Sequence, residues 1–107
     1  MMPNHQGPVV LINTFRLKTE DPTKLIALLT KVTEESVVMA PGFGGATLHL
    51  SLDRERVVMR ARWQSVAQYE AMRTDSDSMS ALREVMKTAI FEPGMFKVVR
   101  EFRPPDV

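Results

Sequence analysis

Cysteine is absent from this chain of 107 residues, and its absence excludes several kinds of chemistry. Without a thiol the protein forms no disulfide and has no thiolate nucleophile, iron–sulfur cluster or cysteine-bound zinc. The sequence also has no Gly-rich phosphate loop after a strand, no nucleophile elbow, and no metal-ligand spacing among its two histidines and its carboxylates. The usual signatures of metal, nucleotide and nucleophilic catalysis are therefore missing, and we expect no bound metal.

The sequence also lacks a large excess of positively or negatively charged residues. Fourteen Lys and Arg residues are scattered among thirteen Asp and Glu, for a formal net charge of +1, so the chain has no basic stripe of the kind that binds nucleic acid. No apolar run is long enough to span a bilayer, and residues 1–8 lack the charged and apolar regions of a signal peptide. We expect a cytoplasmic protein with neither nucleic-acid nor membrane partners.

Length and composition favour one globular domain. Hydrophobic residues at 44% and charged residues at 25% are ordinary for such a protein, and the length is sufficient for one core. Pro and Gly interrupt the start of the chain, and Pro104 and Pro105 lack the N–H that a sheet ladder needs. We therefore predict a flexible segment at residues 1–8, a single domain at 9–103, and a flexible C-terminus at 104–107.

The order of the predicted elements is strand, helix, strand, strand, helix, strand. Runs rich in β-formers predict strands at residues 9–17, 46–52, 56–63 and 95–102. Helical spacing of apolar residues predicts a helix from an Asp21 cap to about residue 38, and another segment at about 77–90. Ser65 and Gln68 form a capping-box pattern that starts a short helix directly after the third strand. This order predicts an α+β protein with the ferredoxin-like split βαββαβ fold and a four-stranded antiparallel sheet.

Two helices cover only one face of such a sheet, yet apolar side chains occur on both faces of the predicted strands. An apolar surface that is left uncovered usually marks an interface. A two-fold homodimer that packs sheet against sheet is the simplest way to cover it, and this would give a dimeric α/β-barrel.

Trp63 is the only tryptophan, and it lies where the third predicted strand meets the short helix. An indole offers a flat apolar face and one N–H donor, so it suits the wall of a small pocket. His49, Tyr69 and Arg83 are polar side chains of kinds that orient an aromatic, oxygenated ligand. The structural alternative is that Trp63 and Tyr69 are core aromatics, while His49 and Arg83 are solvated surface residues.

Several short motifs follow one another at fixed distances along the chain: Pro41-Gly42-Phe43, Leu48-His49, Trp63-Gln64-Ser65, Tyr69 and Leu82-Arg83. From about Leu11 to Phe102 this pattern resembles the antibiotic biosynthesis monooxygenase family of small dimeric ferredoxin-like proteins. The resemblance is to its quinone-forming branch, and it implies oxidation of a polycyclic, anthrone-type polyketide phenol with dioxygen. It also implies that no metal, flavin or haem cofactor takes part.

The resemblance places the family's pocket residues on His49, Trp63, Tyr69 and Arg83. An electron-rich phenol reacts with dioxygen once it is deprotonated, so the protein must hold it flat and stabilise its anion. Trp63 could donate its N–H to a substrate or peroxide oxygen, Tyr69 a hydrogen bond, and Arg83 a charge-assisted contact to the phenolate. His49 is suited to moving a proton near neutral pH.

One position departs from the family's pattern. Quinone-forming members carry an asparagine four residues before the tryptophan, where this chain has Met59. A thioether donates no hydrogen bond and accepts only weakly, and Asn13 on the first strand could supply the missing amide. With Met72 and Met86, Met59 would give an adaptable apolar lining for a flat substrate.

Two other functions fit the same pocket. A polyketide cyclase or isomerase needs only shape and acid–base groups, and tolerates Met59. A non-catalytic dimer that binds small aromatic ligands needs no reaction at all.

Overall fold

The computed structural model describes residues 8–106, apart from the side chains of residues 76 and 77. The elements in chain order are β1 (Val9–Leu17), α1 (Thr23–Glu35), a 3-10 turn (Val37–Met39), β2 (Phe43–Leu50), β3 (Arg56–Trp63), α2 (Val66–Arg73), α3 (Ser76–Thr88), β4 (Ala89–Glu92) and β5 (Met95–Phe96). The predicted flexible N-terminal segment lies outside the described residues except for Pro8, and so does Val107. Within the described part of the chain, no helix is long and apolar enough to cross a membrane.

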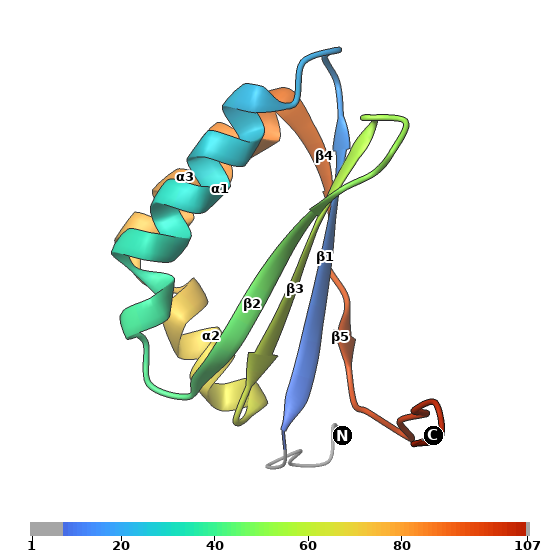
Figure 1. Cartoon of the computed structure of the whole chain (residues 1–107). Coiled ribbons are helices and arrows are strands. Elements are labelled where there is room, and N and C mark those ends of the chain that lie inside the picture. Colours follow the sequence, from blue (N-terminus) through green and yellow to red (C-terminus); the bar gives the residue numbers. More distant parts are fainter. Residues whose placement is uncertain (1–7, 107) are drawn as a thin grey trace.

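The antiparallel sheet has the order β2-β3-β1-β4, and β5 also pairs with β1. The three α-helices lie on one side of this sheet and leave its other face open (Figure 1). The ferredoxin-like fold is thus confirmed. In the single chain the sheet is open and does not close into a barrel.

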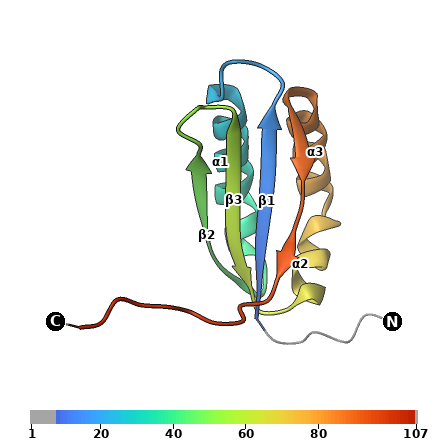
Figure 2. The same ribbon diagram turned by 90° about the vertical axis from the view of Figure 1, so that its right-hand side faces the viewer.

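The last predicted strand differs from the observed one. Residues 89–92 already form β4, and Pro93-Gly94 separates it from the two-residue β5, so that the sheet has five strands in place of four. Proline has no N–H for the ladder, but Ile12 N–H donates to the Gly94 carbonyl at 2.8 Å and keeps the gap attached to β1. After Phe96 the chain runs away from the sheet without further strand pairing among the described residues (Figure 2).

β1 and β3 have the predicted bounds and pair from Val9, opposite Trp63, to Arg16, opposite Arg56. Val9 lies opposite Trp63, Asn13 opposite Met59, and Phe15 opposite Val57. Directly paired residues project from the same face of a sheet. These pairs face the helices, because most of their members belong to the core between the two layers.

The core consists of two clusters between the sheet and the helices. One surrounds Trp63 and contains Val9, Leu11, Ala61, Trp63, Val66 and Tyr69. The other contains Phe15, Leu25, Leu29, Val57, Val85 and Ala89. Trp63 and Tyr69 are therefore core residues of one cluster, as the structural alternative expects, whether or not they also bind a ligand.

The helix starts follow the predicted capping residues. Asp21 Oδ1 accepts from Thr23 N–H at 3.0 Å, although the helix begins one residue later than the pairing with Pro22 predicted. Ser65 Oγ accepts from Gln68 N–H at 3.2 Å at the start of α2 and donates to Gln68 Oε1 at 3.0 Å. Because α2 follows β3 so closely, Tyr69 is held next to Trp63.

Candidate active site

A cavity of about 120 Å³ lies between the sheet and the helices. Side chains of β1, β3, β4 and all three α-helices line it, and most of them are apolar. Among the described residues in its lining, Arg73 is the one charged side chain. The described part of the chain contains no group of three or more His, Asp or Glu side chains placed to hold a metal ion.

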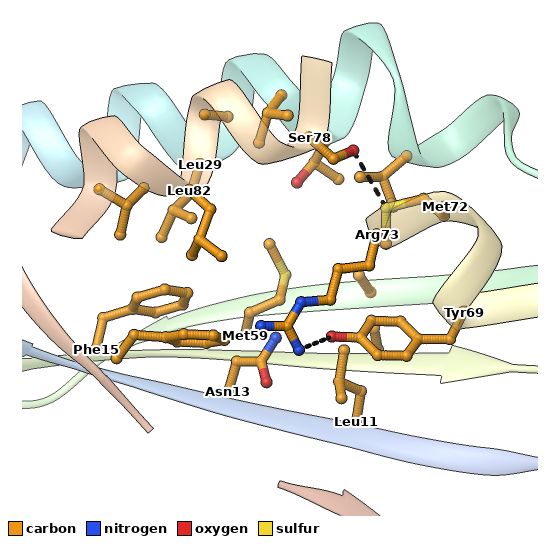
Figure 3. A pocket seen from close by; sticks show the side chains of 18 of the residues that line it. Leu11, Asn13, Phe15, Leu29, Met59, Tyr69, Met72, Arg73, Ser78 and Leu82 are labelled. Carbon is orange, nitrogen blue, oxygen red and sulfur yellow. Dashed lines mark hydrogen bonds between the residues drawn. The ribbon is translucent and has the colours of Figure 1, made fainter. Parts of the chain in front are cut away.

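Arg73 reaches into this cavity from the last position of α2 (Figure 3). Its guanidinium donates to the Tyr69 hydroxyl at 3.5 Å, a long hydrogen bond between residues one helical turn apart. Its central carbon also lies 5.7 Å from the centre of the Phe91 ring, which stacks on Phe15 at 5.1 Å. A cation and a phenol therefore meet beside a stacked aromatic pair.

Two buried polar atoms at the cavity have no hydrogen-bond partner among the described residues: Trp63 Nε1 and Asn13 Oδ1. Trp63 is only 1% exposed, and Phe43 and Tyr69 hold it edge-on with ring centres 5.5 and 5.8 Å away. A buried polar atom without a partner costs about 1–3 kcal/mol, and natural cores contain few of them. Both atoms belong to side chains that line the same cavity, where a ligand could provide the missing partner.

The structure brings together five of the eight residues predicted for the site. They are Asn13, Met59, Trp63, Tyr69 and Met72, and each lines the cavity. The Met72 sulfur accepts from the Ser78 hydroxyl at 3.3 Å, so this methionine is already partly ordered.

The other three predicted residues lie outside the cavity lining. His49 is exposed on β2, where its neighbours Leu48 and Leu50 face the helices, and it therefore projects from the open face of the sheet. Arg83 and Met86 are exposed on α3 and line an adjoining outer groove, which shares Arg73 and Leu82 with the cavity. The expectation that His49 and Arg83 converge with Trp63 and Tyr69 is not met in this structure.

The residue that sequence reasoning missed is Arg73. Its signal was the four-residue spacing from Tyr69, because residues at i and i+4 share one face of a helix. Arg83 was predicted instead, because its side chain suits an oxygenated ligand and because the resemblance places a pocket arginine at this position. Its helix turns that side chain toward the outer groove.

The family model described as antibiotic biosynthesis monooxygenase matches residues 8–91 of this chain. The protein belongs to the antibiotic biosynthesis monooxygenase family. Tetracenomycin-F1 monooxygenase from Streptomyces glaucescens is 43% identical over 65 residues, which make up 61% of this chain. The match spans 58% of that relative's own length, which is less than two thirds of it.

Solved structures support the same fold. SnoaB, a cofactor-independent oxygenase from Streptomyces nogalater, superposes with a TM-score of 0.81 at 19% identity, over 92% of this chain and 99% of that one. A protein from Mycobacterium tuberculosis gives a TM-score of 0.78 at 18% identity, over 89% and 98% of the two chains. At these identities the likeness establishes the fold.

Proposed function

We propose that this protein is a cofactor-independent monooxygenase that oxidises an anthrone-type polycyclic phenol to a quinone with dioxygen. Membership of the family and the likeness to a relative named for monooxygenation support this proposal. The observation that carries it is the pairing of Arg73 with Tyr69 in an otherwise largely apolar cavity, next to the unpartnered Trp63 N–H. Such a site accepts a flat ligand whose oxygen carries negative charge.

The cavity lining contains no described histidine or carboxylate that could act as a general base. We therefore propose that the proton of the substrate passes to solvent, and that Arg73 favours this ionisation because a nearby positive charge lowers the pKa of a phenol by stabilising its anion. The Tyr69 hydroxyl would share the same oxygen. This arrangement replaces the proton-moving role that the resemblance implied for His49.

The reaction balances without an added reductant. The ionised anthrone forms a carbon–oxygen bond to dioxygen at its reactive ring carbon, and protonation gives a hydroperoxide. Loss of water from this hydroperoxide breaks the oxygen–oxygen bond and leaves the quinone carbonyl, so that one dioxygen gives one quinone oxygen and one water. We propose that Trp63 Nε1–H donates to the peroxide oxygen, which would provide this buried donor with a partner.

The cavity is small for a tricyclic substrate. At about 120 Å³ it is below the roughly 150 Å³ of an engineered cavity that holds benzene. Binding therefore requires side chains to move aside. Met59, Met72 and Arg73 are flexible and line the cavity, so they are the ones we expect to move.

Incubation of the purified protein with an anthrone in air tests the activity. Quinone should form faster than with heat-treated protein and stop under strict anaerobiosis. Equal rates with native and heat-treated protein would contradict the proposed activity. A different product that continues to form without dioxygen would favour the cyclase or isomerase.

Arg73→Met and Arg83→Met form a matched pair that tests which arginine binds the anion. Loss of a hydrogen bond from a charged group costs about 1.5–3 kcal/mol, so Arg73→Met should lower kcat/KM by about 10- to 150-fold. It should also raise the apparent pKa of the pH–rate profile, since the anion loses its counter-charge. Arg83→Met should change kcat/KM by less than about threefold. It should leave the apparent pKa of the profile unchanged. The reverse result would favour the role that the resemblance implied for Arg83.

We also propose that two copies of the chain associate through the open face of the sheet. Ile90 and Phe96 are about half exposed, and the segment after β5 carries Val99 and Phe102 with 87% and 82% of their surface exposed. Apolar side chains at this density usually mark an interface. A dimer of this kind would also cover His49.

A further inference from the structure

Sulfur is readily oxidised, and in this chain methionine holds all of it, since cysteine is absent. Met59 and Met72 line the cavity, and both are half-buried. Met39 is 80% exposed, and Met79 and Met86 line the outer groove with 45% and 51% of their surface exposed. An oxidant dissolved in water should therefore reach Met39 first, whereas an oxidant bound in the cavity meets Met59 and Met72.

The sulfurs of the two cavity methionines differ in their partners. The Met72 sulfur accepts a hydrogen bond from Ser78 at 3.3 Å, whereas among the described residues no such bond reaches the Met59 sulfur. A hydrogen bond draws on a sulfur lone pair, and the lone pair is what attacks an oxidant. Met59 is therefore the more nucleophilic of two methionines of similar burial.

Met59 also lies close to the position proposed for the peroxide oxygen. Met59, Ala61 and Trp63 project from the same face of β3, and all three line the cavity. The small side chain of Ala61 leaves space between the indole and the thioether, and Figure 3 shows the Met59 side chain extending from the sheet into the cavity. An aromatic ring fills a cavity of about 120 Å³, so a ring that contacts Trp63 also contacts Met59.

We propose that Met59 is an oxidation site that takes one oxygen atom from an aromatic hydroperoxide bound in the cavity. The sulfur lone pair attacks the terminal peroxide oxygen, a sulfur–oxygen bond forms, and the oxygen–oxygen bond breaks. The electron pair of the broken bond stays on the oxygen attached to carbon, which takes up the hydroperoxide proton. One hydroperoxide and one thioether give one alcohol and one methionine sulfoxide, so the hydroperoxide gains the two electrons that Met59 loses. Arg73 and the Tyr69 hydroxyl stabilise the oxygen on which negative charge develops.

The proposed function provides such a hydroperoxide as the intermediate before the quinone, and the inference rests on that function only for this source. Transfer of oxygen to Met59 leaves a hydroxyanthrone in place of the quinone. Each hydroperoxide diverted in this way leaves one sulfoxide in the protein. The sulfoxide places a polar oxygen on the cavity floor, where the thioether was apolar.

Cumene hydroperoxide, which carries one aromatic ring, tests the site without any oxygenation. The protein is treated with it or with hydrogen peroxide, and peptide mass spectrometry measures the sulfoxide at each methionine. Hydrogen peroxide should oxidise Met39 before Met59, in the order of their exposure. Cumene hydroperoxide should raise the ratio of Met59 to Met39 sulfoxide by about tenfold or more, because binding holds the oxidant against the thioether. Oxidation of Met59 should also level off as its concentration rises, while that of Met39 continues to increase.

Met72→Leu is the matched control, because Met72 has similar burial in the same lining and leucine keeps its volume. This variant should show the wild-type oxidation of Met59. Met59→Leu should lose the saturable oxidation and keep that of Met39. Wild-type protein unfolded in urea should show no preference for Met59 with either reagent. The wild-type pattern decides the inference even if a variant does not fold.

The same order of oxidation with both reagents would overturn the inference, and so would saturable oxidation of Met72 in place of Met59. The outcome is separable from that of the proposed function. Saturable oxidation of Met59 in a protein that forms no quinone from an anthrone would refute the oxygenation and leave the oxidation site standing. Quinone formation combined with oxidation in the order of exposure would do the opposite.

Discussion

Met59 and Asn13 face each other across β1 and β3, and this pair decides what the cavity floor offers a ligand. Met59 contributes volume and an adaptable thioether, while Asn13 contributes hydrogen bonds. The floor therefore carries an amide on the strand next to the position where the resemblance expects one. Met59 on β3 thus determines the shape of the floor, and Asn13 on β1 determines its polarity.

Met59→Ala should lower KM for a tricyclic substrate. The substitution removes a side chain that must otherwise move, at a cost of about 0.5–1.5 kcal/mol, so KM should fall by about 2- to 10-fold. The free energy of unfolding should fall by about 2 kcal/mol, at the low end for such a change because Met59 is half-buried. Steady-state kinetics and urea unfolding measure the two effects.

Met79→Ala is the matched control, because Met79 is 45% exposed in the outer groove. It should leave KM unchanged and alter the free energy of unfolding by less than about 0.5 kcal/mol. A rise of KM in Met59→Ala would mean that Met59 contacts the substrate and does not obstruct it.

The two arginines show the limit of sequence reasoning for single residues. Period-two alternation was enough to place Met59 and Trp63 on one face of β3. The pairing of β1 with β3 in the structure adds Asn13 to that face, opposite Met59. Whether Arg73 or Arg83 points into the cavity depends on how α2 and α3 are rotated about their axes relative to the sheet. That rotation is set by packing between elements, which no local pattern contains.

Helix α2 connects the sheet to the site, since its eight residues carry both Tyr69 and Arg73. A helix of this length is unstable alone, so its end and its packing must hold it. The Ser65 cap supplies one of these supports. Positioning of the cation thus depends on a hydroxyl outside the cavity lining.

Ser65→Ala should lower the free energy of unfolding by about 1 kcal/mol, within the usual 0.5–2 kcal/mol for loss of a cap. It should also raise KM, because Tyr69 and Arg73 would be held less firmly. Ser65→Asp keeps an acceptor for Gln68 N–H and should restore both values to near wild type. Urea unfolding followed by Trp63 fluorescence provides the measurement. Equal stability of the Ala and Asp variants would show that the cap contributes nothing.

The bounds of a helix or strand could be predicted where the residues of that segment alone determine them. β1 and β3 match their predictions, while α1 ends at Glu35, before the predicted position, and passes into a 3-10 turn. At the boundary between α3 and β4, Ala89 and Phe91 suit either a helix or a strand. Pairing of this segment with residues 14–17 of β1 decides for the strand, and such long-range pairing has no local signal.

The whole molecule consists of one layer of helices on one face of an open sheet. The order of strands and helices was sufficient to predict this arrangement, because few topologies satisfy it. The open face carries charges as well as apolar groups. Arg16 pairs with Glu92 at 3.9 Å across the strands, and Arg60 and Arg62 are exposed. An interface here would have a polar part and an apolar part, the latter supplied by β5 and the segment after it.

The wild-type chain should therefore have twice the 12.1 kDa mass of one copy in size-exclusion chromatography with light scattering. A double variant, Val99→Asp with Phe102→Asp, should have the mass of one copy, because burial of two carboxylates in an apolar contact opposes association. Leu52→Asp is the matched control: Leu52 is fully exposed at the hairpin tip, away from the proposed interface, and this variant should remain dimeric. A wild-type mass of 12.1 kDa would refute the dimer. Dissociation of the Leu52 variant together with the double variant would instead place the contact at the hairpin.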